Sequence, residues 1–148
     1  MRISPEILVF ARMAYKEARV MTELQGKTIL FIGAGNMAQP MIVGALQQDE
    51  IDPEKVTVIC GTSAGKDKKA LQNALQEAKI GLPEDTIISR EEAAHNLRDA
   101  AYDIVIYGVK PQMATEVLDR YQHCVKPGAT LISIAGGLPA QFFMPYVP

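Results

Sequence analysis

Cysteine is scarce in this sequence, since Cys60 and Cys124 are the two among 148 residues and they lie far apart. A disulfide framework needs several paired cysteines, and a structural zinc site needs closely spaced ligands. Neither pattern is present. We therefore expect two packed, reduced thiols, no metal site and a cytoplasmic location.

Excess charge of one sign and long apolar runs are also missing. The net charge is −2 and no basic stripe occurs, so we expect neither nucleic acid nor a membrane as a partner. The longest apolar run before the first glycine covers residues 7–11, which is too short to span a bilayer. No long apolar segment with a small-residue cleavage site indicates a secretory signal.

Linkers, internal repeats and low-complexity tracts are absent as well. The chain is 48% hydrophobic and 22% charged, a composition typical of globular proteins. A chain of this length forms one ordinary domain that buries about two-thirds of its unfolded surface.

A glycine turn between a strand and a helix is the most informative stretch of the chain. Residues 27–46 contain a short apolar strand (28–32), the turn, and an apolar helix. Gly33, Gly35 and Ala38 fit the pattern G-x-G-x-x-A, in which the first glycine reverses the chain and the second leaves room for a pyrophosphate. The third small residue lets the helix pack close to the strand, and its N-terminus attracts phosphate. The turn predicts dinucleotide binding.

Alternating apolar patterns predict the remaining elements. Ser89 to Glu92 form a capping box that opens one helix, and Pro127-Gly128 are expected to close another. The alternation of strands and helices predicts an α/β fold, a doubly wound parallel sheet of the Rossmann type with strand order 3-2-1-4-5. The expected helices cover about 36–48, 64–79, 89–98 and 112–121, and the later strands 56–60, 86–88, 102–109 and 129–134.

Residues 1–26 form an N-terminal extension that we predict to be helical, because apolar residues recur on one helical face. The extension is either an extra helix docked on the domain or an upstream addition to a protein that begins functionally at Met21. We favour the second alternative, because the predicted domain needs nothing before Lys27.

The ligand of such a sheet lies at the carboxyl ends of the strands, where the strand order reverses. This crevice is walled by residues 33–37 on one side and 109–112 on the other. Lys110 either supplies a positive charge near a phosphate or ribose or is a solvated lysine, and Pro111 stiffens its loop. Residues 135–137 offer backbone near the nicotinamide end, or form a plain turn.

The turn after the second strand indicates which cofactor is preferred. An NAD site usually carries a carboxylate there. This turn has Cys60, Gly61, Thr62 and Ser63, and Lys66, Lys68 and Lys69 follow it. No carboxylate is then available to repel a 2′-phosphate, so we expect NADP, with NADPH preferred over NADH, although the lysines could equally form a solvated helix face.

Catalytic residues are not identified by any motif. His95 and His123 lie on predicted helices without an acidic or serine partner in a recognisable arrangement. We find no nucleophile elbow and no paired carboxylates, so the catalytic residues stay unknown.

Three segments, FIGAGNMA, VKPQ and ISIAGG, resemble the N-terminal cofactor domain of pyrroline-5-carboxylate reductase in content, order and spacing. The resemblance covers about residues 27–137. It implies an NAD(P)H-dependent oxidoreductase of proline biosynthesis, which reduces a ring C=N bond by hydride transfer.

The resemblance also implies roles for particular residues. Gly35, Asn36 and Met37 would line the pyrophosphate, and Thr62 and Ser63 would meet the adenosine ribose or its phosphate. The residues that would flank the nicotinamide ribose are Val109, Lys110 and Pro111, with Ala135 and Gly136 nearby.

The chain departs from this family at Pro40 and Gly136 and after Gly137, where the similarity fades. The family's helical C-terminal domain, which forms the dimer and much of the imino-acid site, has no counterpart. We therefore expect residues 138–148 to be a truncated segment, an apolar surface near 138–147, and little turnover by this chain alone. A small-molecule imino acid would bind, and a homo-oligomer would form, in a full-length protein.

Two alternatives stay open from the sequence. The chain could be a stand-alone dinucleotide-binding module that regulates rather than catalyses. It could also be the cofactor domain of another NADP-dependent reductase or of a hydroxyacid dehydrogenase.

Overall fold

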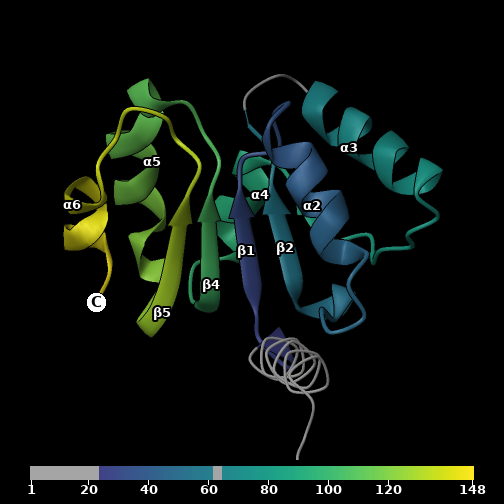
Figure 1. The fold of residues 1–148 in the computed structure, drawn as a ribbon, viewed down its shortest axis with the longest axis horizontal. Helices are drawn as coiled ribbons and strands as arrows, with labels where there is room; N and C mark the ends of the chain where they lie inside the picture. The colour runs from purple at the N-terminus through teal and green to yellow at the C-terminus, as the bar shows by residue number, and fades with distance from the viewer. Residues whose placement is uncertain (1–23, 62–64) are drawn as a thin grey trace, which may run out of the picture.

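The computed structural model describes residues 24–61 and 65–148, and these form a parallel sheet with helices on both faces (Figure 1). The strand order is β3-β2-β1-β4-β5, and every neighbouring pair is parallel. The predicted Rossmann-like fold and strand order are confirmed. The strands are β1 (Ile29–Ile32), β2 (Val56–Ile59), β3 (Ile87–Ile88), β4 (Tyr102–Tyr107) and β5 (Val125–Ser133).

The helices divide between the two faces. The helices α2 (Ala38–Leu46) and α3 (Lys66–Glu77) share one hydrophobic cluster with β1 and β2. The helices α4 (Arg90–Asn96) and α5 (Ala114–Tyr121) share a second cluster on the opposite face, where the short α6 (Ala140–Phe143) also packs. Short 3-10 turns cover Pro53–Lys55, Pro111–Met113, Gln122–Cys124 and Met144–Tyr146. The helix predicted near the N-terminus lies outside the described residues, apart from Leu24 and the turn after it.

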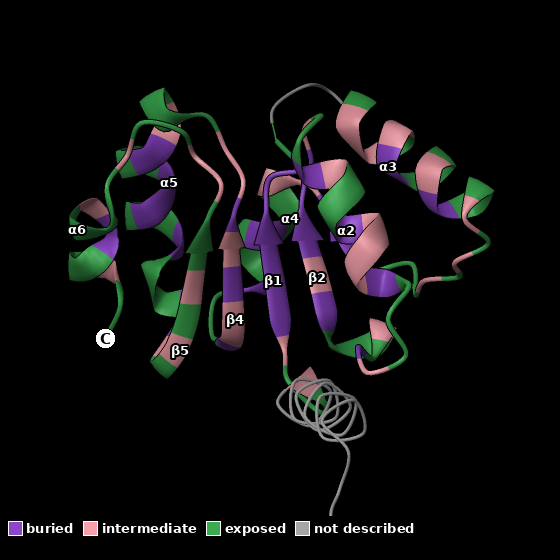
Figure 2. Cartoon of the chain, in the orientation of Figure 1, coloured by how far each residue is buried: buried purple, intermediate pink, exposed green. Residues whose placement is uncertain are grey.

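Burial falls from β1 at the centre of the sheet through β4 to the edge strand β5, as Figure 2 shows. All four residues of β1 are buried, because α2 covers one face of this strand and α4 and α5 cover the other. In β5, only Val125 is buried. Ile132 of this edge strand is 40% exposed. No described helix is long and apolar enough to cross a membrane.

The capping box predicted at the start of α4 is confirmed. The Ser89 hydroxyl accepts a hydrogen bond from the Glu92 N–H at 3.1 Å, and the Glu92 carboxylate accepts one from the Ser89 N–H at 2.7 Å. Hydrogen bonding from Ser89 to the carboxylate, the bond from the Ser89 N–H above all, holds the pKa of Glu92 below its ordinary value. The first turn of the helix is therefore determined by local sequence.

The prediction for Pro127-Gly128 is wrong, because these residues lie inside β5 rather than at the end of a helix. Tyr102 pairs with Val125 and Ile104 with Thr130, so four residues of β5 bulge opposite one residue of β4. Gly128 has a φ of +79°, which a glycine adopts easily. An edge strand tolerates proline and a bulge, since one side of its backbone needs no partner.

The segment after β5 packs more closely than expected. Phe143 is 7% exposed, and its ring meets the edge of Tyr107 with centroids 5.7 Å apart. Met144 and Val147 are exposed. The expected apolar surface is thus present at these two residues, while Phe143 belongs to the core.

A polar cluster ties the amino-terminal ends of three strands together. The Asp103 carboxylate accepts hydrogen bonds at 2.9 Å from both the N–H and the hydroxyl of Thr28. The Lys126 ammonium donates to the same carboxylate at 3.3 Å. These bonds, the one from the Thr28 N–H above all, lower the pKa of Asp103.

Candidate functional site at the carboxyl edge of the sheet

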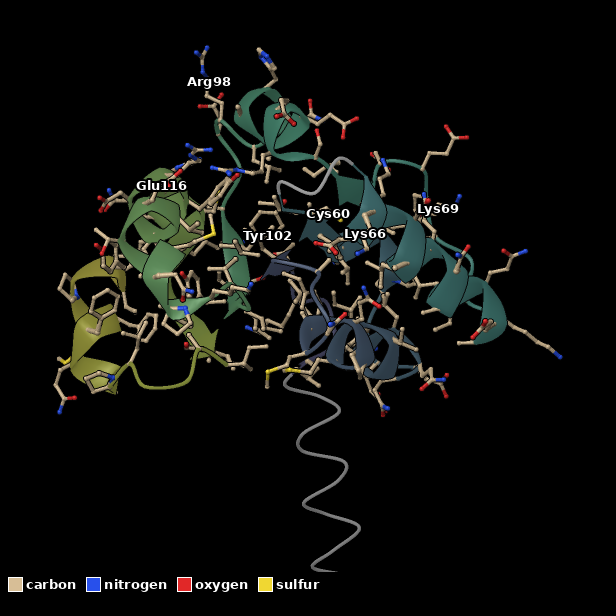
Figure 3. The ribbon with its side chains drawn as sticks, turned by 90° about the horizontal axis from the view of Figure 1, so that it is seen from above. Cys60, Lys66, Lys69, Arg98, Tyr102 and Glu116 are labelled. Atoms are coloured by element: carbon tan, nitrogen blue, oxygen red, sulfur yellow. The ribbon has the colours of Figure 1, made fainter. Side chains whose placement is uncertain are left out.

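Three chain segments meet where β1, β2 and β4 end. The Gly33 N–H donates to the Ile59 carbonyl at 2.9 Å, and the Gly108 N–H donates to the Ile32 carbonyl at 2.8 Å. The glycine turn therefore lies between the turn after β2 and the segment after β4. Figure 3 shows this edge from above, with Cys60 at the end of β2.

Gly33 is a packing residue as well as a turn residue. Its φ is +103°, and a Cβ there would lie 2.7 Å from the Gly108 carbonyl oxygen. A Cβ on Gly108 would in turn lie 3.3 Å from the Cβ of Ala38. The expected close approach of Ala38 to the sheet is thus made against Gly108, a residue that the sequence analysis did not single out.

Gly35 has the opposite surroundings, because a Cβ there would meet nothing within 4 Å. Asn36 and Met37 are exposed beside it, and Met37 is 73% exposed. The helix α2 begins here without a side-chain cap and without an acidic residue in its first turn. Its positive dipole end therefore has open space and no anion from its own first turn, which suits a pyrophosphate.

The second predicted wall adjoins the first at one residue. The Val109 side chain comes within 3.1 Å of the position that a Cβ on Gly33 would take. Lys110 is exposed and leads into the 3-10 turn that Pro111 opens. The sheet thus brings the glycine turn and the VKPQ segment together.

Ala135 and Gly136 follow β5 on the far side of β4 from β1. The Ile134 N–H donates to the Tyr107 carbonyl at 3.0 Å, which holds this segment against the end of β4. The Ala135 N–H donates to the Ser133 hydroxyl at 3.1 Å, and Gly136 is exposed.

The turn after β2 is described in part, because Thr62 and Ser63 lie outside the described residues. Lys66 and Lys69 are exposed on the first turns of α3 (Figure 3). Burial raises the pKa of Cys60 to about 11, and the charge of Asp67 adds to this effect. Asp67 belongs to the first turn of α3, and its charge reaches Cys60 at the end of β2.

A hollow of about 70 Å³ opens beside the glycine turn, on the face that α4 and α5 cover. Its apolar lining comes from the ends of β1 and β2 and from the segment after β4. Arg90, the first residue of α4, and Tyr121, the last of α5, also line it. The sequence analysis missed both side chains, although Arg90 follows β3 and so belongs to the same edge. The lining includes Gly33, Ile59, Val109, Met113, Arg90 and Tyr121.

The two histidines and Cys124 lie elsewhere. His95 is exposed on α4. The His123 ring nitrogen Nε2 lies 2.9 Å from the Leu97 carbonyl and 3.4 Å from the Cys124 sulfur. Burial raises the pKa of the Cys124 thiol to about 11, so it is not a thiolate at neutral pH. Among the described residues, no three His, Cys, Asp or Glu side chains are grouped to hold a metal ion.

The sequence profile of a family described as "NADP oxidoreductase coenzyme F420-dependent" matches residues 28–137. The pyrroline-5-carboxylate reductase of Pseudomonas aeruginosa is 35% identical over 111 residues, which are 75% of this chain and 35% of that protein. The pyrroline-5-carboxylate reductase of Haemophilus influenzae is 30% identical over 125 residues, 84% of this chain and 40% of that protein. The chain therefore spans well under half the length of these curated relatives.

Solved structures share the fold. A Plasmodium falciparum pyrroline carboxylate reductase, crystallised with NADP bound, matches with a TM-score of 0.50 and 21% identity, over 83% of this chain and 38% of that one. A protein from Corynebacterium glutamicum matches with a TM-score of 0.54 and 12% identity, over 90% of this chain and 68% of that one.

Proposed function

The chain belongs to the family described as "NADP oxidoreductase coenzyme F420-dependent", and on that premise we propose that it is the NADP-binding part of a pyrroline-5-carboxylate reductase-like oxidoreductase. The observation that carries the proposal is the contrast between the two glycines. The space beside Gly33 is filled by the Gly108 backbone, whereas the space beside Gly35 is empty and adjoins the uncapped N-terminus of α2. The similarity to curated pyrroline-5-carboxylate reductases supports the substrate class.

Different residues at the carboxyl edge of the sheet would bind different parts of the cofactor. The backbone of Gly35, Asn36 and Met37 at the start of α2 would hold the pyrophosphate. Val109, Lys110 and Pro111 would flank the nicotinamide ribose, with Ala135 and Gly136 beside it. When bound, the reduced nicotinamide supplies a hydride to the ring C=N bond of an imino acid.

The preference for NADP rests on the turn after β2 and the start of α3. Thr62 and Ser63 would supply hydroxyls to a 2′-phosphate, and Lys66 and Lys69 would supply exposed positive charge. Asp67 opposes them from the same turn. We propose that Lys66, Lys68 and Lys69 at the start of α3 outweigh this one carboxylate, so that NADPH binds more tightly than NADH.

Fluorescence titration with NADPH and NADH at fixed salt tests cofactor binding. A charge-assisted contact to the 2′-phosphate contributes about 1.5–3 kcal/mol, so NADPH should bind about ten- to a hundredfold more tightly. Equal affinities, or tighter NADH, would contradict the preference. No binding of either cofactor by the folded chain would overturn the proposal itself.

The substrate class is tested by NADPH oxidation with pyrroline-5-carboxylate and with a 2-oxo acid as the control. Hydride transfer requires the reacting carbon to lie about 3–3.5 Å from the nicotinamide. A signal with the cyclic imine, however slow, and none with the 2-oxo acid supports the proposal. Faster oxidation with the 2-oxo acid would instead favour a hydroxyacid dehydrogenase.

A further inference from the structure

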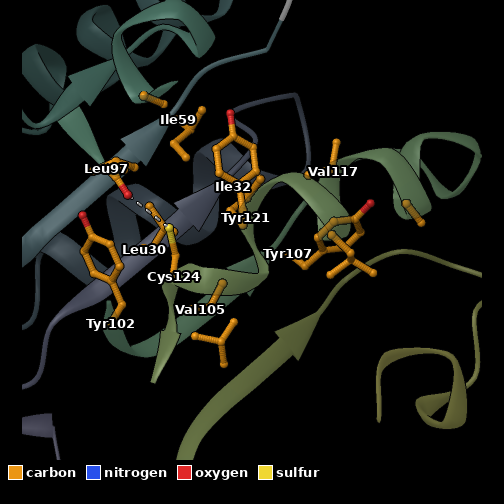
Figure 4. Close-up of a cluster of buried hydrophobic side chains, with 14 of the residues drawn as sticks. Leu30, Ile32, Ile59, Leu97, Tyr102, Val105, Tyr107, Val117, Tyr121 and Cys124 are labelled. Carbon is orange, nitrogen blue, oxygen red and sulfur yellow. Dashed lines mark hydrogen bonds between the residues drawn. The ribbon is translucent and has the colours of Figure 1, made fainter. Parts of the chain in front are cut away.

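The glycine turn is held tightly on its strand side and loosely on its helix side. Ile32, the last residue of β1, lies in a buried cluster that includes Ile59 (Figure 4). The Gly33 N–H donates to the Ile59 carbonyl at 2.9 Å, and the contacts of Gly33 leave no room for a Cβ. A Cβ on Gly35, by contrast, would meet nothing within 4 Å among the described residues. Because a glycine adopts many backbone conformations, the peptide bond between Ala34 and Gly35 can rotate unless another group restrains it.

A side-chain hydrogen bond restrains this peptide bond. The Gln39 side-chain amide donates to the Ala34 carbonyl at 3.1 Å, and Ala34 is 1% exposed. In a regular α-helix the Ala38 N–H would donate to this carbonyl, four residues before it. Here the N–H groups of Ala38 and Gln39 both donate to the Gly35 carbonyl, each at 3.0 Å. The Gln39 side chain therefore takes the place of a backbone donor at the start of α2.

Pro40 weakens the first turn of α2 further. Because a proline has no N–H, Pro40 cannot donate to the carbonyl of Asn36, four residues before it. The helix also begins at Met37 without a side-chain cap. The bond from Gln39 therefore contributes more to holding the turn against the helix than it would in a helix with all its backbone bonds.

The orientation of the restrained peptide bond determines which group the turn presents to a ligand. A peptide bond is planar and trans, so its carbonyl and its N–H point in opposite directions. Because Gln39 holds the Ala34 carbonyl toward α2, the Gly35 N–H points away from the helix, into the open space at its N-terminus. A rotated peptide bond would place the carbonyl oxygen there instead, and the partial negative charge of this oxygen would repel a phosphate.

We propose, on the basis of the function proposed above, that Gln39 is a positioning residue for the pyrophosphate of the cofactor. Its bond to the Ala34 carbonyl keeps the Gly35 N–H directed at the ligand, and Gln39 acts through this backbone group rather than by contact with the cofactor. NADPH and NADH share the pyrophosphate. Loss of the Gln39 amide should therefore weaken both cofactors by the same factor.

The same helix offers a matched control beyond its other end. The Gln48 side-chain amide donates to the Gly44 carbonyl at 3.3 Å, which is also a bond from a glutamine to a backbone carbonyl. Gln39→Met and Gln48→Met both remove one such bond and keep a side chain of similar length. Only the first bond reaches the glycine turn.

The proposal is tested by fluorescence titration with NADPH and NADH and by NMR relaxation dispersion of the ligand-free chain. Gln39→Met should weaken both cofactors about three- to tenfold, as expected for the loss of one hydrogen bond. It should also make the Gly35 amide exchange between two environments on the microsecond-to-millisecond timescale. Gln39→Ala, which adds no bulk, should repeat both effects. Gln48→Met should match the wild type in both measurements, and thermal unfolding confirms that each variant is folded.

Equal cofactor affinities of folded Gln39→Met and Gln48→Met would overturn the inference while leaving the proposed function intact. A weaker affinity without exchange at Gly35 would also overturn it, because a change at the helix surface would then explain the loss. A wild-type chain that binds neither cofactor would instead reject the proposed function. The measurement at Gly35 needs no ligand, so it would still show whether Gln39 holds the turn.

Discussion

Gly33 and Gly35 are the same amino acid two positions apart, yet the structure gives each a different reason to be small. The sequence motif selected both positions, and it assigned room for a ligand at Gly35 on the basis of the pattern alone. Gly33 is surrounded by the backbone of Gly108, which approaches from a strand far along the chain. Only the three-dimensional packing separates a fold requirement from a binding requirement.

This difference predicts that an alanine at Gly33 lowers stability, whereas an alanine at Gly35 lowers the affinity for NADPH. Gly33→Ala should lower the free energy of unfolding by at least about 1–3 kcal/mol, because an alanine at φ +103° is strained and its Cβ would meet Gly108. Gly35→Ala should unfold like the wild type but bind NADPH more weakly. Urea unfolding and NADPH titration check both. A stable Gly33→Ala protein would show that the turn can relax.

Asp103 predicts a pH dependence of stability. Its pKa is lowered in the folded chain, so its contribution is fully present above the unfolded value of about 3.9 and is lost as the pH falls through the folded value. Asp103→Asn should cost about 1–2 kcal/mol at pH 7, and less under acid conditions. Urea unfolding at several pH values measures this, and a difference that stays constant down to pH 2 would contradict it.

At the scale of the element, local sequence predicted α4 well and β5 poorly. The capping box of α4 needs only Ser89 and Glu92, which are neighbours in the chain. The start of β5 depends instead on Tyr102 of another strand and on the freedom of a sheet edge. Pro127 and Gly128 usually end an element, and no local rule reveals that an edge strand includes them here.

The capping box gives a prediction for α4. Ser89→Ala should destabilise the chain by about 1 kcal/mol, since the Glu92 N–H loses its acceptor. Ser89→Thr keeps a hydroxyl at the same place and serves as the control. Thermal unfolding of the two variants should therefore differ. If both melt at the same temperature, solvent replaces the cap without cost.

At the scale of the whole molecule, the alternation of strands and helices predicted the sheet order, because parallel crossovers leave few arrangements. The place of the glycine turn at the end of β1 could be predicted, because it depends on one chain segment. Arg90 and Tyr121, which line the hollow beside this turn, were missed, because they come from different helices.

The open edge of the sheet predicts self-association. Ile132 is 40% exposed on β5, and the outer side of this strand pairs with no described strand. Ile132→Lys should reduce association at high concentration and change stability little, because charged edge residues disfavour strand pairing. Analytical ultracentrifugation checks this, with Met144→Lys, which is exposed outside the sheet, as the control. Equal association of both variants and the wild type would exclude the β5 edge.

The placement of β1 between β2 and β4 has a consequence for synthesis on the ribosome. The hydrogen bond from Thr28 to Asp103 forms only after a further 75 residues have been synthesised. At translation rates of about 5–20 residues per second, that interval lasts about 4–15 seconds. Throughout it, β1, whose four residues are all apolar, has a neighbouring strand on one side only. We expect synonymous codons that slow elongation between β2 and β4 to prolong this exposure and to increase aggregation of the nascent chain.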